Sequence, residues 1–250
     1  MFVGVEIEDR LAIVTLRRSE AMNALSKALV DELHRTFDAL DADCVIVTGD
    51  GGNFVAGADI AELKERGALD SLAAINSSLF RKIEEFPAPV IAAIQGYCLG
   101  GGCELALACD IRVAGRGARF GQPEVGLGIM PAAGGTQRLP RVIGLGRAKE
   151  WVLTGWMYDA EEAHRVGLVN VLVNDEDVMK TARELAGRIL KRGPLAVRLA
   201  KAALNASMRT GLDAGLAIES ISQAVLFETE EKRRRMQEFL DRKKHRPEAR

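Results

Sequence analysis

Long apolar runs are missing from this sequence of 250 residues, and so is an excess of charge of one sign. No apolar run reaches the roughly 18–20 residues that a membrane-spanning helix needs, so we expect none. Lys and Arg number 34 against 35 Asp and Glu, a near-neutral balance that argues against general binding to nucleic acid or to an anionic membrane. The first nine residues carry three acids and no basic stretch, which predicts no signal or transit peptide.

Cysteine is also scarce, and its spacing argues against two kinds of site. The four cysteines each lie in an apolar segment and form neither a C-x-x-C pair nor a zinc-binding pattern; they are Cys44, Cys98, Cys103 and Cys109. We interpret them as small buried side chains with free thiols. Free thiols are typical of a reducing compartment, so we expect a cytoplasmic protein without a metal site.

Aromatic residues make up only 5% of the chain, whereas apolar residues together make up 48%, enough for a sizeable core. The length suits one large domain, or a core with a smaller appendage. Strand and helix signals alternate over about the first 175 residues, and the rest of the chain has helical periodicity. We therefore expect an α/β core over residues 1–193 and a helical region over residues 194–250, with Pro194 favourable at a helix start.

The individual elements follow from hydrophobic periodicity and capping residues. Apolar and β-branched runs predict strands at Val3–Glu8, Leu11–Leu16, Cys44–Thr48, Val90–Ile94, Ile111–Ala114, Arg119–Phe120 and Val169–Val173. Helical spacing, with Ser26 and Asp159 as N-caps, predicts helices at residues 27–40, Ala58–Arg66, Ser71–Glu84, around Glu104, Gly135–Arg141, Arg147–Thr154, residues 160–166, Val178–Leu190, Pro194–Met208, Leu212–Phe227 and Glu230–Lys243.

Glu104 is a carboxylate in an otherwise apolar segment, directly after the glycine triplet Gly100–Gly102. Burying a carboxylate is costly unless it is hydrogen-bonded or used in chemistry. The residue is therefore either a structural carboxylate with satisfied hydrogen bonds or an acid/base catalyst, and the local sequence does not separate the two.

Two glycine-rich turns each lead from an extended segment into a helix: Phe54–Ile60 and Gly100–Gly102. The simplest interpretation is a pair of tight strand-to-helix turns. A turn of this kind also leaves the first backbone N–H groups of its helix free. If the two turns meet, the N–H groups of Ala58 and Gly101 can donate to one carbonyl oxygen. Each donor of such an oxyanion hole is typically worth about 3–4 kcal/mol of activation barrier.

The remaining polar residues have plainer interpretations. Glu124, in Phe120–Val125, is by itself a solvated loop acid, while Asp59 and Asp110 suit helix capping or pairing with arginine. The histidines accompany neither a G-x-S-x-G nor an H-E-x-x-H motif and are expected to be solvated; they are His34, His164 and His245. The basic tail, residues 232–246, predicts an amphipathic helix docked through Met236, Phe239 and Leu240, or else a cationic surface for a phosphate-bearing ligand or RNA.

Several motifs occur together in the order and spacing of one family. They are Val14-Thr-Leu-Arg17, Met22-Asn-Ala-Leu25, Ala56-Gly-Ala-Asp-Ile60, Gly96 to Asp110, Gln122-Pro-Glu124, Gly134-Gly-Thr-Gln-Arg138 and the C-terminal Phe239. In these motifs the chain resembles the crotonase (enoyl-CoA hydratase/isomerase) superfamily over nearly its whole length, and most closely its short-chain enoyl-CoA hydratases. The resemblance implies a spiral of ββα units with a C-terminal helical region, assembled as a homotrimer or as a homohexamer of two trimers.

The resemblance also implies a substrate and a site. The substrate is an acyl-CoA thioester whose carbonyl oxygen accepts from the N–H groups of Ala58 and Gly101, while Glu104 and Glu124 occupy both catalytic positions of the hydratases. Coenzyme A belongs to the substrate, so no separate cofactor is expected. The implied reaction is the lyase step of fatty-acid β-oxidation, syn addition of water to a trans-2-enoyl-CoA to give a 3-hydroxyacyl-CoA. Further substrate contacts are expected at Ala56, Gly57, Asp59, Ile60 and Ala61.

The chain departs from the family pattern at several positions. Arg17-Arg18-Ser19 replaces Asn-Arg-Pro, Ala61 replaces a lysine, Arg234-Arg235 replaces Glu-Gly, and Ala132 replaces a glycine. The first three changes affect contacts to the adenine and phosphates of CoA more than the chemistry. Arg18 or the cations of the tail are the candidates to replace those contacts.

The sequence is also compatible with two other functions. A Δ3,Δ2-enoyl-CoA isomerase needs only one acid/base carboxylate, and hydration of crotonyl-CoA separates it from a hydratase. A non-catalytic protein that binds CoA esters or RNA would keep the fold and use the basic tail, and salt-dependent retention of RNA would indicate it. The presence of both Glu104 and Glu124 favours the hydratase.

Overall fold

The computed structural model describes residues 1–244, with side chains through residue 242. His245 and the last residues of the predicted basic tail lie outside this range. The chain forms two compact units, Met1–Leu190 and a second that starts at Lys191. Within residues 1–244, no helix has both the length and the apolar character needed to cross a bilayer.

The first unit is built around a sheet of six strands in the order β1-β2-β3-β4-β6-β9. β1 and β2 form an antiparallel hairpin, and every later neighbour in this sheet pairs in parallel. These connections through helices are typical of an α/β fold. The strands are β1 (Val3–Glu8), β2 (Leu11–Leu16), β3 (Cys44–Gly49), β4 (Val90–Ile94), β6 (Ile111–Gly115) and β9 (Val171–Val173).

A second sheet of three short strands, in the order β5-β7-β8, positions the candidate site. β5 (Tyr97–Leu99) and β7 (Arg119–Gly121) pair in parallel with Leu99 opposite Gly121, and β8 (Met157–Asp159) pairs antiparallel to β7. Because parallel strands end at the same edge, the segments that follow β5 and β7 emerge side by side. One segment enters the glycine triplet and Glu104, and the other leads to Glu124.

Helices connect the strands of the first unit and build most of the second. In the first unit they are η1 (Ser19–Ala21), α1 (Lys27–Ala39), α2 (Ile60–Glu65), α3 (Ala68–Leu72), α4 (Ile75–Glu85), α5 (Gly101–Ala108), η2 (Pro123–Leu127), α6 (Gly135–Ile143), α7 (Leu145–Thr154), α8 (Ala160–Arg165), η3 (Asp175–Asp177) and α9 (Val178–Leu190). The second unit contains α10 (Pro194–Ser207), α11 (Leu212–Phe227) and α12 (Glu230–Lys244).

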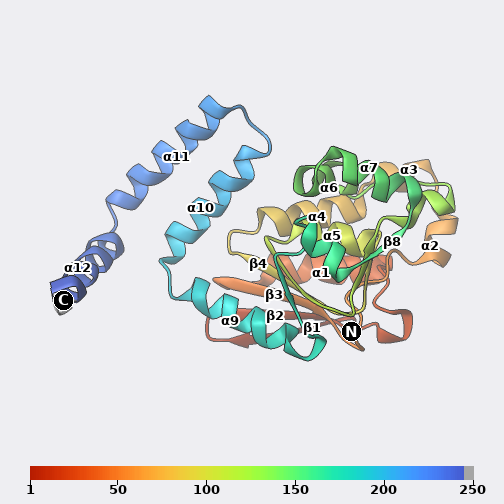
Figure 1. Cartoon of the computed structure of the whole chain (residues 1–250), viewed down its shortest axis with the longest axis horizontal. Coiled ribbons are helices and arrows are strands. Elements are labelled where there is room, and N and C mark those ends of the chain that lie inside the picture. Colours follow the sequence, from red (N-terminus) through yellow and green to blue (C-terminus); the bar gives the residue numbers. More distant parts are fainter. Residues whose placement is uncertain (245–250) are drawn as a thin grey trace. The chain divides into compact units, whose positions relative to one another are not determined.

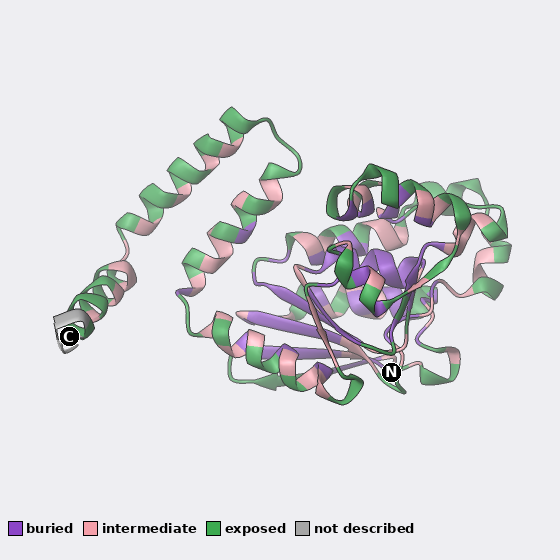
Figure 2. Cartoon of the chain, in the orientation of Figure 1, coloured by how far each residue is buried: buried purple, intermediate pink, exposed green. Residues whose placement is uncertain are grey.

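The core lies on both faces of the large sheet, and the strands β2, β3, β4 and β6 are mostly buried, whereas most of β1 is exposed (Figure 2). Alternate residues of each strand point to opposite faces, so Val45 and Val47 join one apolar cluster while Cys44 and Ile46 join the other. The first cluster contains α1, α4 and α5, and the second contains α9 (Figure 1). Burial of β3 and β4 on both faces explains why they are continuous apolar runs in the sequence.

Most predicted elements are present, and the differences have local causes. The predicted helix at Ser71–Glu84 is wrong as a single helix: α3 ends at Leu72 and α4 starts at Ile75, because Ala74 adopts a left-handed conformation with φ 50°. The predicted helix at Ala58–Arg66 starts two residues later, since Asp59 caps it. β5 and β8 were not predicted, because three-residue strands carry almost no periodic signal.

The second unit carries the basic tail. Arg234 pairs with Glu238 at 2.6 Å, and Arg235 pairs with Glu231 at 2.9 Å, so both cations are engaged within α12 itself. Met236, Phe239 and Leu240 are all exposed in this chain. The predicted helix is confirmed, whereas its predicted docking through these three apolar side chains is not seen within the described residues, where they are exposed to solvent.

Candidate active site

Helix α5 places Glu104 inside the core. All eight residues of the helix are buried, and Glu104 is only 3% exposed. The glycines at its start are required by close packing, because a Cβ on Gly102 would lie 2.1 Å from the carbonyl oxygen of Val55. The other residues of the helix are small or apolar, so Glu104 is its one carboxylate.

Two backbone N–H groups hold the Glu104 carboxylate. Its Oε1 accepts from the N–H of Ala133 at 2.8 Å and from that of Gly135 at 2.7 Å. Burial is the largest influence and raises the pKa of Glu104, while these hydrogen bonds and the positive charge of Arg138 lower it in part. The carboxylate is therefore oriented through one oxygen, and no hydrogen bond within residues 1–244 engages its Oε2.

Glu124 lies in η2, directly after β7, and its carboxylate is adjacent to the backbone of Gly100. Burial, the largest influence, and the negative charge of Glu104 together raise the pKa of Glu124 to about 7, against a backbone hydrogen bond that lowers it. Near neutral pH this carboxyl group is therefore divided between its protonated and ionised forms. Gln122 is buried, and its amide satisfies its hydrogen bonds when the nitrogen faces Glu124. In this orientation the amide nitrogen donates to Glu124 Oε1 at 3.0 Å and to Oε2 at 3.2 Å.

The N–H groups of Ala58 and Gly101 lie next to each other. An ideal Cβ on Gly101 would be 3.9 Å from the nitrogen of Ala58. Leu25 bonds the residues on either side of Ala58, donating to Gly57 O at 2.8 Å and accepting from Asp59 N at 3.1 Å, so Ala58 N–H points away from Leu25. Gly101 is the first residue of α5 and has no partner one turn earlier. Neither N–H group donates to an acceptor within the described part of the chain.

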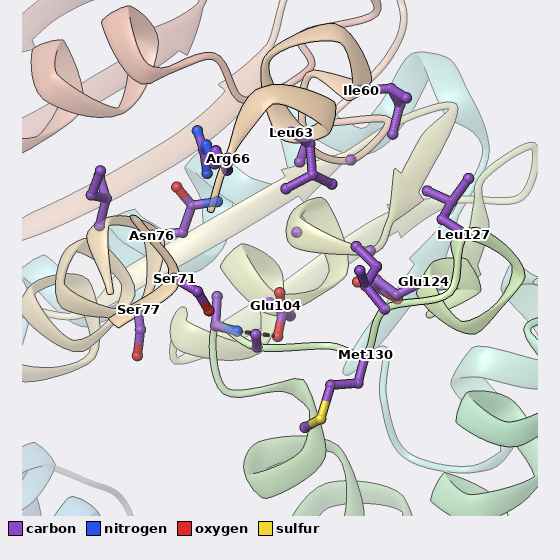
Figure 3. A pocket seen from close by; sticks show the side chains of 18 of the residues that line it. Ile60, Leu63, Arg66, Ser71, Asn76, Ser77, Glu104, Glu124, Leu127 and Met130 are labelled. Carbon is purple, nitrogen blue, oxygen red and sulfur yellow. Dashed lines mark hydrogen bonds between the residues drawn. The ribbon is translucent and has the colours of Figure 1, made fainter. Parts of the chain in front are cut away.

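These groups line one cavity of about 430 Å³. Figure 3 shows Glu104 and Glu124 among its lining side chains, with a hydrogen bond to Glu104 dashed. Apolar side chains make up much of the remaining wall, as is usual for a pocket that binds an organic substrate. The predicted site residues in the wall are Ala56, Gly57, Ala58, Ile60, Gly101, Glu104 and Glu124.

Asp59 and Ala61 are not among the described residues that line the cavity. Asp59 Oδ1 instead accepts from the N–H groups at the start of α2, and its Oδ2 pairs with Arg18 Nη2 at 2.6 Å. The hydrogen bond to Arg18 is the main reason that the pKa of Asp59 lies below its usual value. Arg18 is also bonded to Ala24 O at 2.8 Å, so its guanidinium is committed to this loop.

The residues that hold the two glutamates carry no functional signal of their own in the sequence. Gln122 and Arg138 are parts of longer family motifs, and nothing marks them individually. Ala133 and Gly135 hold Glu104 through their backbone N–H groups. Main-chain donors leave no side-chain signal. The only available indication was the clustering of small residues in Ala132–Gly135, which permits a close approach of the backbone.

The arrangement suits acid/base chemistry next to a polarised carbonyl group. Two adjacent N–H donors can stabilise negative charge on one oxygen, and two carboxylates of raised pKa border the same space. Within the described residues, no group of three or more His, Cys, Asp or Glu side chains could hold a metal ion.

Comparison with known proteins assigns the family. Residues 6–248 match the family described as "Enoyl-CoA hydratase/isomerase". The crotonyl-CoA hydratase of Syntrophomonas wolfei is 45% identical over 96% of this chain and 95% of its own length, and the short-chain-enoyl-CoA hydratase of Clostridium acetobutylicum is 43% identical over 97% and 95%. The crystal structure of an enoyl-CoA hydratase from Bacillus anthracis superposes with a TM-score of 0.92 at 37% identity, covering 97% of each chain. The chain belongs to the enoyl-CoA hydratase/isomerase family and has the crotonase fold expected from its motifs.

Proposed function

We propose that this protein is an enoyl-CoA hydratase that adds water syn across the double bond of a trans-2-enoyl-CoA. The observation that carries the proposal is the meeting of two carboxylates and two unpaired backbone N–H groups at one cavity. The relatives named as crotonyl-CoA and short-chain-enoyl-CoA hydratases, which match over nearly their whole length, support the same reaction.

The backbone pair activates the substrate. The thioester carbonyl oxygen accepts from Ala58 N–H and Gly101 N–H, and this polarisation draws electron density away from C3 of the enoyl group. As hydroxide character adds at C3, enolate charge develops on the same oxygen, and the fixed donors stabilise it without reorganisation. The proposed chemistry therefore needs no metal ion or separate cofactor.

The two glutamates divide the proton transfers. Ionised Glu104 takes a proton from the attacking water, whose oxygen bonds to C3, and protonated Glu124 delivers a proton to C2. The pKa of about 7 keeps part of the Glu124 population protonated near neutral pH, as this role requires. Because the two carboxyl groups share one site, their titrations are coupled, and the observed values belong to the pair.

The setting and assembly are part of the proposal. We expect a cytoplasmic enzyme of β-oxidation, supported by four buried cysteines that form no disulfide within the described residues. We also expect a homotrimer or a homohexamer of two trimers. Large apolar side chains exposed on α10 to α12 support self-association, since contact with another copy would remove them from water; they include Leu204, Ile221 and Phe239.

The direct test mixes the full chain with crotonyl-CoA and follows the absorbance of the conjugated thioester. We expect the absorbance to fall and the product to gain the mass of one water. An isomerase would instead convert a 3-enoyl-CoA to its 2-enoyl isomer without a change of mass. Absence of water addition across a series of 2-enoyl-CoA esters of increasing length would refute the hydratase function.

A further inference from the structure

Arg138 of α6 is committed to groups next to Glu104 but does not line the cavity in the described structure. Its Nε and Nη2 donate to the two carboxylate oxygens of Glu84 in α4, at 3.2 and 3.0 Å. Its Nη1 donates to the carbonyl oxygen of Ala133 at 3.1 Å. The same Ala133 donates its N–H to Glu104, so one residue links the guanidinium to the carboxylate.

The loop before α6 is shaped around this guanidinium. Gly134 has φ 112°, a conformation that favours glycine, and a Cβ there would lie 2.0 Å from Nη1 of Arg138. The backbone of Arg138 also donates to Gly134 O at 2.7 Å. Ala133 and Gly135, the two donors to Glu104, flank Gly134. We therefore expect a displacement of the Arg138 side chain to disturb the loop that carries both donors.

We propose that Arg138 is a positioning residue for Glu104: anchored by Glu84, it fixes the loop at Ala133–Gly135 so that two N–H groups hold one oxygen of the catalytic carboxylate. This inference rests on the hydratase function proposed above. The bidentate pair with Glu84 gives the guanidinium one orientation, which a lysine cannot reproduce.

Arg138 also acts on Glu104 through its charge. The charged groups that face Glu104 are Arg138 from α6 and Glu124 from η2, and Glu84 of α4 faces Arg138. The positive charge lowers the pKa of Glu104 and so favours the ionised form that takes a proton from water. Removal of the charge should therefore move the ascending limb of the rate–pH profile to higher pH.

Three variants of the full chain separate geometry from charge. Arg138→Gln removes both, Arg138→Lys keeps the charge without the bidentate geometry, and Gly134→Ala keeps the arginine but displaces it. Arg165→Gln is the matched control, since Arg165 forms an exposed bidentate pair with Glu162, with both bonds at 2.6 Å. For each variant, kcat, KM and the rate–pH profile are measured with crotonyl-CoA, and circular dichroism monitors folding.

We expect all three variants to lower kcat by about 10–100-fold while KM changes by no more than about twofold, as for a loss of orientation at the reacting centre. All three should also shift the ascending limb to higher pH, because the N–H groups of Ala133 and Gly135 lower the pKa of Glu104, and Arg138→Gln should shift it most, because it removes the positive charge as well. The inference is overturned if the folded variants match Arg165→Gln in kcat and pH profile. If Arg138→Gln does not fold, the lysine and alanine variants decide the geometric role by the same comparison. An inactive wild-type protein would count against the hydratase function itself, whereas an active wild type with unaffected variants counts only against the role of Arg138.

Discussion

The backbone of Gly100 lies directly against the carboxylate of Glu124, so that a Cβ at residue 100 would be 2.9 Å from Glu124 Oε1. Gly100 also has φ 50° and ψ −122°, a combination that glycine adopts readily but in which a side chain costs about 1–3 kcal/mol. We expect Gly100→Ala to reduce stability by that amount and to lower kcat, because Glu124 must move.

The matched control is Gly146→Ala, since Gly146 lies inside α7 with open space around the position of its Cβ. This control should keep its kcat and its stability, or gain up to about 1 kcal/mol from better helix propensity. Urea denaturation and steady-state kinetics check both variants. Equal kcat values for the two would contradict the contact between residue 100 and Glu124.

The two glutamates should be separately essential for hydration. Glu104→Gln and Glu124→Gln keep the shape of each side chain but remove its proton transfer, which typically contributes 10²–10⁴-fold, so we expect kcat to fall by about that factor. Binding of a CoA ester should persist, because the Ala58 and Gly101 donors are unchanged. Calorimetric titration with a non-reactive acyl-CoA checks the binding. A variant with near-normal kcat would remove its glutamate from the mechanism.

The raised pKa of Glu124 makes the folded state less stable as pH rises. Between the ordinary value of 4.5 and about 7, the folded protein binds the proton more tightly than the unfolded chain, so stability falls across this window. With allowance for partial exposure, we expect a loss on the order of 1–2 kcal/mol from this group. Glu124→Gln should not show it.

The test compares the difference in unfolding free energy between wild type and variant at two pH values. Unfolding free energies of wild type and Glu124→Gln are measured in urea at pH 5 and pH 8, and the variant should gain on the wild type at the higher pH. The pH dependence that comes from Glu104 is present in both proteins, so it largely cancels in this comparison. A wild-type-to-variant difference that is equal at both pH values would contradict the burial of an ionisable group at residue 124.

Asp59 should matter for stability rather than for chemistry. Its side chain caps α2 and pairs with Arg18, so we expect Asp59→Ala to cost about 1–2 kcal/mol of unfolding free energy. Asp59→Asn keeps an acceptor for the cap and should cost less. Thermal unfolding measures both. If Asp59→Ala unfolds like the wild type but has a much higher KM, Asp59 is a substrate contact after all.

The predictability of the fold from the sequence depended on how each element is stabilised. Val178–Leu190 and Leu212–Phe227 were predicted with the correct bounds, because the first has a clear helical period and both have clear ends. β5 and β8 were missed, since they exist only through pairing with β7. The break at Ala74 was also missed, because alanine is a strong helix former and its left-handed conformation is imposed by the surrounding fold.

The two glutamates of the candidate site could be predicted from the sequence, but the groups that hydrogen-bond to them could not. Glu104 stood out as an acid in an apolar segment, but Glu124 resembled an ordinary loop acid until its motif was considered together with the others. That the two share one cavity follows from the parallel pairing of β5 and β7, a non-local contact without a local pattern. The hydrogen bonds of Ala133, Gly135 and Gln122 depend on backbone and amide orientation, which a residue list does not encode.

In the proposed mechanism the groups that polarise the thioester are peptide N–H groups, and this has a consequence for evolution of the family. Among substitutions at positions 58 and 101, only proline removes the amide N–H itself, whereas a single base change can replace either glutamate. Duplicated copies of such a gene can therefore lose or replace a glutamate and still keep the backbone donors proposed to bind the thioester. New reactions on activated acyl groups can arise from the old scaffold in this way, one side chain at a time.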